Sequence, residues 1–148
     1  MITITDVLIA EHRLFTELFD DIEKLLPKLK VLGEVRLLSG LLERLLRSHA
    51  DAEQNLAYVA LDHTLKDKGQ LDRLHQDHEE IDASLVRARR SLKIEEARRL
   101  LRGAIKASRE HFRREERGVF PMIEHLLQPG TLAELGTARV AARAGLAR

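Results

Sequence analysis

The chain has 148 residues, enough for one domain that buries a core without disulfides or a structural metal. Its formal net charge of +1 gives no overall field that would attract nucleic acid or an anionic membrane, and the absence of cysteine excludes disulfides, thiolate metal sites, iron–sulfur clusters and cysteine nucleophiles. With 33% charged and only 3% aromatic residues, the composition favours long amphipathic helices over sheets. For a metal site, His, Asp and Glu remain as ligands.

The N-terminal segment has the features of neither a leader nor a membrane anchor. Residues 1–6 lack a basic region and a long apolar run, and no later stretch approaches the roughly 20 apolar residues of a membrane span. We therefore expect a cytoplasmic protein with neither a membrane partner nor a nucleic-acid partner.

The first two predicted helices have apolar positions that alternate by four and three residues, the spacing of one helix face. Thr5 or Asp6 is expected to cap the first helix, and Pro27 and Gly33 bracket the turn to the second. The face of the first helix comprises Leu8, His12, Phe15, Phe19, Ile22 and Leu26. The face of the second comprises Val35, Leu38, Leu42, Leu45, His49, Ala52, Leu56 and Val59.

A third and a fourth helix are predicted after Asp67, Lys68 and Gly69 interrupt the pattern. The face of the third comprises Leu71, His75, His78, Ile81, Leu85, Ala88 and Leu92. The face of the fourth comprises Ala97, Leu101, Ala104, Ser108, His111, Glu115, Gly118 and Met122. Pro121 is expected to kink the fourth helix or to shift its last turns, and the dipeptide Pro129-Gly130 is expected to end it.

A short fifth helix is predicted at the C-terminus. Thr131 and Glu134 form a capping-box pattern, and the weakly amphipathic, Ala-rich sequence that follows favours a flap or tail. Short turns between long helices make neighbouring helices antiparallel. We therefore predict an all-α fold, an up-down-up-down four-helix bundle over residues 1–130 with a short helical tail over residues 131–148.

Each of the four long helices carries a histidine on a face that is otherwise apolar. Two helices add a glutamate four residues later, as His49 with Glu53 and His111 with Glu115. A spacing of four places both side chains on the same helix face, about 6 Å apart along the axis. Burying imidazoles and carboxylates without partners is costly, and a bound cation would remove that cost.

Distances along the chain predict that these residues lie at one level of the bundle. In an antiparallel pair, residues equidistant from the connecting turn lie at similar height. By this rule His12 is level with His49. His78 is level with Glu53 and with His111. We expect six side chains to meet in one layer of the core as metal ligands: His12, His49, Glu53, His78, His111 and Glu115.

A two-fold internal repeat supports the same site. A histidine followed in the next helix by His-x-x-x-Glu occurs twice, once from His12 to Glu53 and once from His78 to Glu115. Each half would supply ligands for one ion, with the two glutamates as bridges. Imidazole suits Fe, Zn, Cu or Ni, and manganese or mixed occupancy stays open. The alternative is a set of core histidines without metal, but their agreement in face, level and repeat favours a metal site.

The order His, His-x-x-x-Glu, His, His-x-x-x-Glu resembles the hemerythrin HHE cation-binding family over roughly residues 5–128. Local patterns that also resemble this family are Glu11-His12, the segment Asp-His-Glu-Glu-Ile at 77–81, and Glu115-Glu116 followed by Phe120-Pro121. The resemblance implies a left-handed four-helix bundle around two iron ions, bridged by carboxylates and an oxo or hydroxo group, that bind dioxygen or react with it. It implies His12, His49, His78 and His111 as terminal ligands and Glu53 and Glu115 as bridges.

The sequence departs from the oxygen-carrying members of that family in two places. Those carriers have His-x-x-x-His on the third helix and His-x-x-x-x-Asp on the fourth, whereas this chain has His75-x-x-His78 and His111-x-x-x-Glu115. A spacing of three also places His75 and His78 on the same helix face, so His75 could add a fifth imidazole to the site. The alternative is that His75 is a rim residue. Without a fifth imidazole, an open or water-filled position favours redox reactivity, peroxide or nitric oxide chemistry, or iron sensing over simple carriage.

Three further residues have alternative roles. His63 and His125 lie about 21 Å beyond the histidines of the predicted site, so we expect surface histidines near helix ends rather than a second metal site. Tyr58 follows Glu53 by about one turn and is expected either to hydrogen-bond the centre or to fill the core with its hydroxyl at the rim.

Two functions share this site. The first is a binding protein whose two irons take up dioxygen, or a related ligand such as nitric oxide or peroxide, in a sensing, storage or redox role. The second is a di-iron enzyme with peroxide-decomposing or oxidase activity, and catalytic consumption of added peroxide would distinguish it from the first. A third hypothesis, a metal-free interaction bundle, predicts that His49→Ala changes stability little.

Overall fold

The computed structural model describes residues 1–65 and 69–145, and within them every regular element is helical, as predicted. The long helices are α1 (Ile4–Leu25), α2 (Leu32–Ala52), α4 (Asp72–Arg90), α5 (Ile94–Arg114) and α7 (Pro129–Arg143). The short elements are η1 (Leu26–Lys28), η2 (Glu53–Tyr58), α3 (Val59–Thr64), η3 (Glu115–Val119) and α6 (Phe120–Leu126). The expected turn residues Asp67 and Lys68 lie outside the described residues, as do residues 146–148 of the predicted tail.

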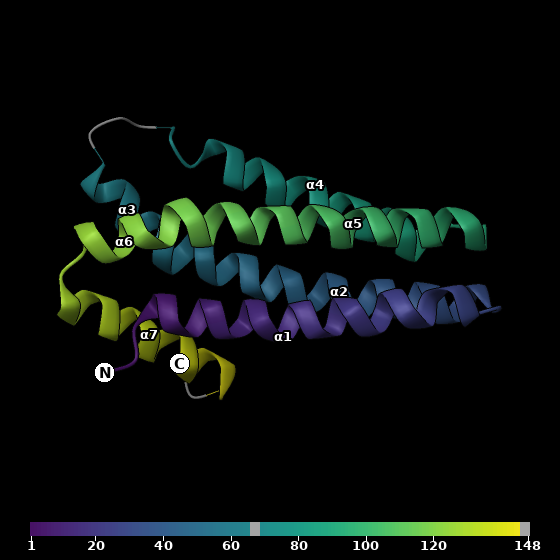
Figure 1. The fold of residues 1–148 in the computed structure, drawn as a ribbon, viewed down its shortest axis with the longest axis horizontal. Helices are drawn as coiled ribbons and strands as arrows, with labels where there is room; N and C mark the ends of the chain where they lie inside the picture. The colour runs from purple at the N-terminus through teal and green to yellow at the C-terminus, as the bar shows by residue number, and fades with distance from the viewer. Residues whose placement is uncertain (66–68, 146–148) are drawn as a thin grey trace.

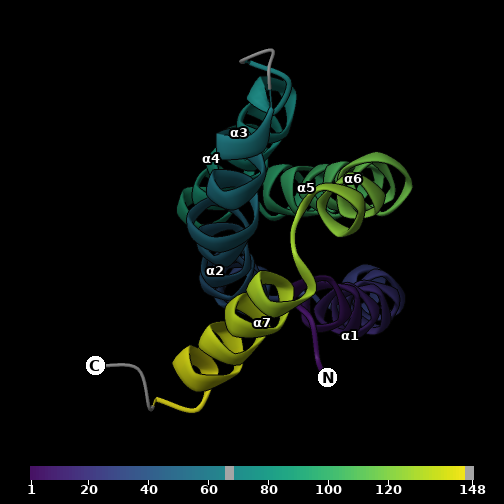
Figure 2. The same cartoon turned by 90° about the vertical axis from the view of Figure 1, so that its left-hand side faces the viewer.

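Four of the helices run lengthwise beside one another. Figure 1 shows α1, α2, α4 and α5 aligned along the long axis of the molecule, with α7 beside α1 near the N-terminus. The end-on view in Figure 2 shows α5 beside α4 and α7 beside α1. α4 packs against α2 and α5, and α1 packs against α2, α5 and α7. In the parts of the chain that the structure describes, no helix combines the length and the apolar character needed to cross a membrane.

Among the described residues, the apolar core is divided into two clusters. Along α1, Leu8 belongs to one cluster and Phe15 to the other, with the buried His12 between them. Leu46 in α2 and Ala57 in η2 belong to different clusters in the same way. The residues predicted as metal ligands therefore occupy a polar layer between two apolar regions.

α1 begins slightly earlier than predicted. Its N-cap is Thr3, whose Oγ1 accepts the backbone N–H of Asp6 at 3.2 Å, while the Asp6 carboxylate accepts the backbone N–H of Thr3 at 2.9 Å. This reciprocal capping box corrects the prediction that Thr5 or Asp6 is the cap. The Thr5 side chain is instead buried and donates to Glu124 at 2.6 Å, which ties α1 to α6.

Two helices change to π-helical winding at the predicted glutamates, since η2 begins at Glu53 and η3 at Glu115. The winding changes near Pro121, as expected, since η3 ends at Val119 and α6 begins at Phe120, and proline has no N–H to donate to the carbonyl of Arg117. No proline lies near η2, and the sequence pattern does not account for it. π-helical segments occur frequently at functional sites.

α7 packs along α1 and starts earlier than predicted. Its N-cap is Gln128 and its first turn holds Pro129, so the predicted start at the Thr131 and Glu134 capping box is wrong. Proline suits this place because the first helical N–H groups have no intrahelical acceptor. The buried residues of α7 are Leu132, Gly136 and Arg139. A face made of one leucine, one glycine and one arginine explains the weak amphipathicity of this segment.

At Gly136, α7 approaches the N-terminal segment so closely that an added methyl group is expected to destabilise the protein. A Cβ at Gly136 would lie 2.7 Å from the carbonyl oxygen of Ile2, too close for an ordinary contact. Gly136→Ala is therefore expected to lower the free energy of unfolding by about 1–3 kcal/mol. Gly103→Ala in α5, where nothing lies within 4 Å of the added Cβ, should raise it by about 0.5–1 kcal/mol. Urea unfolding measures both, and equal stabilities of the two variants would contradict the close approach.

Candidate metal centre

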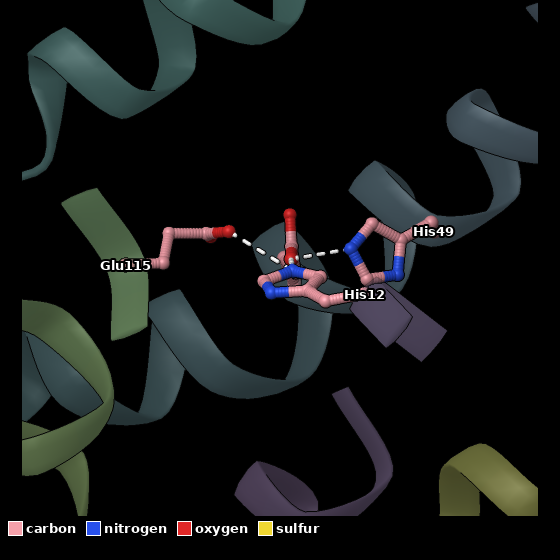
Figure 3. A group of neighbouring side chains, drawn as sticks. His12, His49 and Glu115 are labelled. Carbon is pink, nitrogen blue, oxygen red and sulfur yellow. Dashed lines mark hydrogen bonds and ion pairs between the residues drawn. The ribbon is translucent and has the colours of Figure 1, made fainter. Parts of the chain in front are cut away.

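All six side chains predicted as ligands lie together in the polar layer, and each of these residues is at most 9% exposed. Their ligand atoms form two groups, and within each group the atoms lie within 4.8 Å of one another. The first group is His12, His49, Glu53 and Glu115. The second group is Glu53, His78, His111 and Glu115. Figure 3 shows His12, His49 and Glu115 of the first group pointing toward one another.

Glu53 lies between the two groups. Its Oε1 is 2.7 Å from His49 Nε2 and 3.3 Å from His12 Nε2. Its Oε2 is 2.9 Å from His78 Nε2 and 3.7 Å from His111 Nε2. One carboxylate thus presents one oxygen to each pair of imidazoles, which is the arrangement that a carboxylate bridging two metal ions requires.

Glu115 is shared as well, but its two oxygens have different surroundings. Oε2 is 3.3 Å from His12 Nε2 and 3.4 Å from His111 Nε2. Oε1 accepts a hydrogen bond from the hydroxyl of Tyr58, which is buried in η2. Tyr58 therefore contacts the centre directly, the first of its two expected roles. A carboxylate oxygen has two lone-pair sites, so this hydrogen bond leaves Oε1 able to bind a metal ion as well.

Three buried polar atoms of this layer make no hydrogen bond of acceptable geometry to any residue that the structure describes. They are His49 Nε2, His111 Nε2 and Glu115 Oε2, although carboxylate oxygens lie 2.7 Å from His49 Nε2 and 3.4 Å from His111 Nε2. Such atoms are rare, because leaving a buried polar group unpaired costs about 1–3 kcal/mol. Imidazole nitrogens and carboxylate oxygens are also the atoms that bind divalent first-row cations. The residues present therefore fit a metal ion.

The other ring nitrogen of each histidine is held by a residue outside the two groups. The Nδ1 distances are 2.8 Å from His12 to Glu116, 2.6 Å from His49 to Glu11, 2.9 Å from His78 to Gln54 and 3.1 Å from His111 to Asp77. Carboxylates only accept hydrogen bonds, so Nδ1–H donates in the three carboxylate pairs, and in the neutral form of these imidazoles the Nε2 lone pair faces the cluster. Metal-binding histidines are oriented in this way.

These four orienting residues were not identified from the sequence. Glu11 and Asp77 each precede a predicted histidine ligand by one position, and Gln54 and Glu116 each follow a predicted glutamate by one. The sequence did contain a signal for these four residues, because each one lies directly next to a ligand of the predicted two-fold repeat. Adjacent residues on a helix point about 100° apart, so spacing alone does not indicate that they reach histidines on other helices.

The cluster contains strongly shifted ionisable groups. Burial opposes the charged form of His12, but its interactions with the nearby carboxylates of Glu115 and Glu53 outweigh burial and raise the pKa of His12 to about 10. Burial likewise opposes the charged form of His111, and the same two carboxylates raise its pKa to about 9. Burial would raise the pKa of Glu53, but the charge of His49 and hydrogen bonds with His111, His12 and His49 together outweigh it and hold that pKa well below its usual range. Burial and the charge of Glu53 raise the pKa of Glu115.

Three other histidines lie outside both groups. The His75 ring meets the Tyr58 ring edge-on, with centroids 5.4 Å apart, and the structure does not bring His75 together with the six. His63 and His125 are exposed near the ends of α3 and α6, as expected for surface histidines near helix ends.

A cavity of about 240 Å³ lies between α2, α4 and α5 beside the cluster. Three of the predicted ligands line it, namely His49, His78 and His111. Its apolar lining includes Leu46, Ile81, Leu85 and Phe112. A small, largely apolar molecule in this cavity would lie against the imidazoles of both groups.

The raised pKa values of His12 and His111 predict a pH dependence of metal binding. Both imidazoles are protonated at pH 7 in the metal-free protein, and a cation bound at Nε2 has to displace a proton from each. The apparent affinity for Co²⁺ is therefore expected to rise with pH and to level off only as pH passes about 9 to 10. Calorimetric titration at pH 7 in two buffers of different ionisation enthalpy measures the released protons. Binding without proton release would contradict these pKa values.

Comparison with known proteins identifies the family. The family model for the hemerythrin HHE cation binding domain matches residues 3–123, which include all six clustered side chains. Searches of curated proteins and of solved structures find no match to this chain. The resemblance seen in the sequence is confirmed by the family model, and the His and Glu cluster is compatible with metal binding. The chain belongs to the hemerythrin HHE cation-binding family.

Proposed function

We propose that the cluster holds two iron ions, bridged by Glu53, Glu115 and an oxo or hydroxo group. The observation that carries this proposal is that the two ligand groups share both carboxylates, while each has its own pair of imidazoles. A single ion would not require Glu53 to present one oxygen to each pair. Zinc or manganese fits the same donors, because these ligands discriminate poorly between first-row ions.

In this proposal the chain's residues hold and shield the metal ions. His12 and His49 are the terminal ligands of one ion, and His78 and His111 those of the other. Bound iron would supply redox chemistry with dioxygen, nitric oxide or peroxide. The two apolar clusters on either side of the polar layer exclude bulk water from it.

We also infer the overall topology that positions these ligands. α1, α2 with η2 and α3, α4, and α5 with η3 and α6 act as the four legs of an up-down-up-down bundle, and α7 is an addition to it. The short connections between successive long helices support this topology, because they favour antiparallel neighbours.

The first candidate function is binding of dioxygen or a related small ligand in a sensing, storage or redox role. The cavity beside the histidines supports it, because a diatomic molecule or peroxide is far smaller than about 240 Å³. Tyr58 supports it as well, since its hydroxyl donates to Glu115 Oε1 and so holds that carboxylate in place beside the metal site.

The second candidate function is a di-iron enzyme that decomposes peroxides or acts as an oxidase. The volume and apolar lining of the cavity favour it, because they would accept a substrate larger than dioxygen, such as an organic hydroperoxide. Addition of a hundredfold excess of peroxide to the iron-loaded protein separates the two functions. Sustained consumption supports the enzyme, and bleaching of the centre after about one equivalent supports the binding protein.

The di-iron proposal is tested by metal content and visible spectrum. Protein reconstituted anaerobically with ferrous iron is expected to hold about two irons per chain. Exposure to air should produce an oxo-bridge absorption band that reduction removes. Less than about half an iron per chain after reconstitution would contradict the proposal.

Two alanine variants give a matched comparison within this test. Glu53→Ala removes one of the two carboxylates common to both groups and is expected to lose both irons. His75→Ala, on the same helix as His78 but outside both groups, is expected to keep them. Loss of iron from His75→Ala would instead make His75 a fifth imidazole ligand.

A further inference from the structure

α7 reaches the candidate metal centre through one carboxylate. Arg139 donates from Nε to Glu11 Oε1 at 2.9 Å and from Nη2 to Glu11 Oε2 at 3.0 Å, which is a bidentate pair. Arg143 donates from Nε to Oε1 at 3.1 Å. Oε2 of the same Glu11 accepts the Nδ1–H of His49 at 2.6 Å. A continuous chain of hydrogen bonds therefore connects α7 with a predicted ligand.

The second half of the internal repeat has the same arrangement around Asp77. Its Oδ2 accepts the Nδ1–H of His111 at 3.1 Å and a hydrogen bond from Arg114 Nη1 at 2.6 Å. Its Oδ1 lies 3.0 Å from Arg73 Nε. The two-fold repeat thus extends beyond the predicted ligands, because each of these two histidines is held by a carboxylate and each carboxylate by two guanidinium groups.

The two halves differ in the origin of the guanidinium groups. Arg73 and Arg114 lie on α4 and α5, inside the segment that matches the family model, whereas Arg139 and Arg143 lie on α7, outside it. The side chain of Arg139 is only 6% exposed, while those of Arg73 and Arg114 are 58% and 41% exposed. Water can replace part of what the exposed arginines do, but it has little access to Arg139.

Arg139 and Glu11 depend on each other. A buried guanidinium without a counter-ion is strongly unfavourable, so α7 can pack in this position only when Glu11 is ionised and turned toward it. That orientation of Glu11 is also the one that presents Oε2 to His49. Without Arg139, Glu11 would keep only the partly exposed Arg143 as a guanidinium partner. Glu11 could then turn toward water, and the His49 ring would lose the acceptor that fixes its orientation and tautomer.

We propose that α7 is a functional part of the metal centre, in which Arg139, assisted by Arg143, positions Glu11 and through it His49, so that packing of α7 and metal binding strengthen each other. This inference rests on the proposed metal site. Arg139 is a positioning residue, because it touches neither the ligand atoms nor the cavity. Since coupling between two equilibria is reciprocal, a partner that captured α7 would weaken metal binding by the same factor.

The first test compares Arg139→Met with a matched control. Arg109→Met also removes a guanidinium that pairs with two carboxylates of α1, Asp20 and Glu23, at 2.7 and 3.3 Å. The measurement is the rate at which a chelator removes Fe²⁺ from the anaerobically loaded protein, with metal-free melting temperatures recorded alongside. Arg139→Met is expected to lose iron about 10-fold faster or more, and Arg109→Met to lose it at the wild-type rate.

Rescue separates positioning from simple packing. Arg139→Lys keeps the charge and one hydrogen bond to Glu11, so its rate of iron loss should fall between those of the wild type and Arg139→Met. Arg114→Met, which weakens the equivalent support of Asp77, should also accelerate iron loss. If Arg139→Met lowers only the metal-free melting temperature and releases iron at the wild-type rate, the role of Arg139 is structural and the inference is overturned.

The second test uses the wild-type protein and so does not depend on the folding of a variant. Backbone amides of α7 are expected to exchange with deuterium about 10-fold more slowly in the iron-loaded than in the metal-free protein, as reciprocity requires. Equal exchange in the two states would overturn the coupling. A wild type that binds no iron would overturn the proposed function itself, whereas a wild type that binds iron but shows no change in α7 would overturn only this inference.

Discussion

The dominant constraint on this protein is the burial of two carboxylates, Glu53 and Glu115, among four imidazoles in the middle of a helical core. Both glutamates are fully buried, and their pKa values move in opposite directions. The charge of His49 and hydrogen bonds with the imidazoles outweigh burial and hold the pKa of Glu53 well below its usual range, whereas burial and repulsion by the charge of Glu53 raise the pKa of Glu115. The imidazoles offset part of this repulsion, and a cation between the carboxylates would offset the rest. The surrounding helices act as a frame that keeps these six groups together and apart from water.

Successive sets of side chains surround the two buried glutamates. The Nε2 atoms of the histidines face the carboxylates, their Nδ1 atoms face four orienting side chains, and arginines hold the two most buried of those, Glu11 and Asp77. The π-helical winding also positions a side chain of this layer. A residue five positions on points about 140° away in an α-helix, but the i→i+5 repeat of η2 returns Tyr58 to the side of Glu53, where it reaches Glu115.

The helices and the six clustered side chains followed from the sequence because they depend on local spacing. An apolar face alternating by four and three residues predicts a helix, and His49 with Glu53 must share that face whatever the rest of the chain does. The pairing of Arg139 with Glu11 joins residues 128 positions apart, and no periodicity encodes it. The start of α7 at Pro129 was missed for a related reason, since a proline that ends one helix can equally occupy the first turn of the next.

The polar layer also bears on how the molecule unfolds. Leu8 and Phe15 lie in different apolar clusters with His12 between them, so the contacts that would make the whole bundle one cooperative unit pass through the layer. Repulsion between the buried carboxylates of the polar layer weakens the contacts between the two apolar clusters in the metal-free protein. Two ions, held by histidines from α1, α2, α4 and α5 and by the shared Glu53 and Glu115, would join the two ends. The metal site would then determine whether the chain melts in one transition or in two.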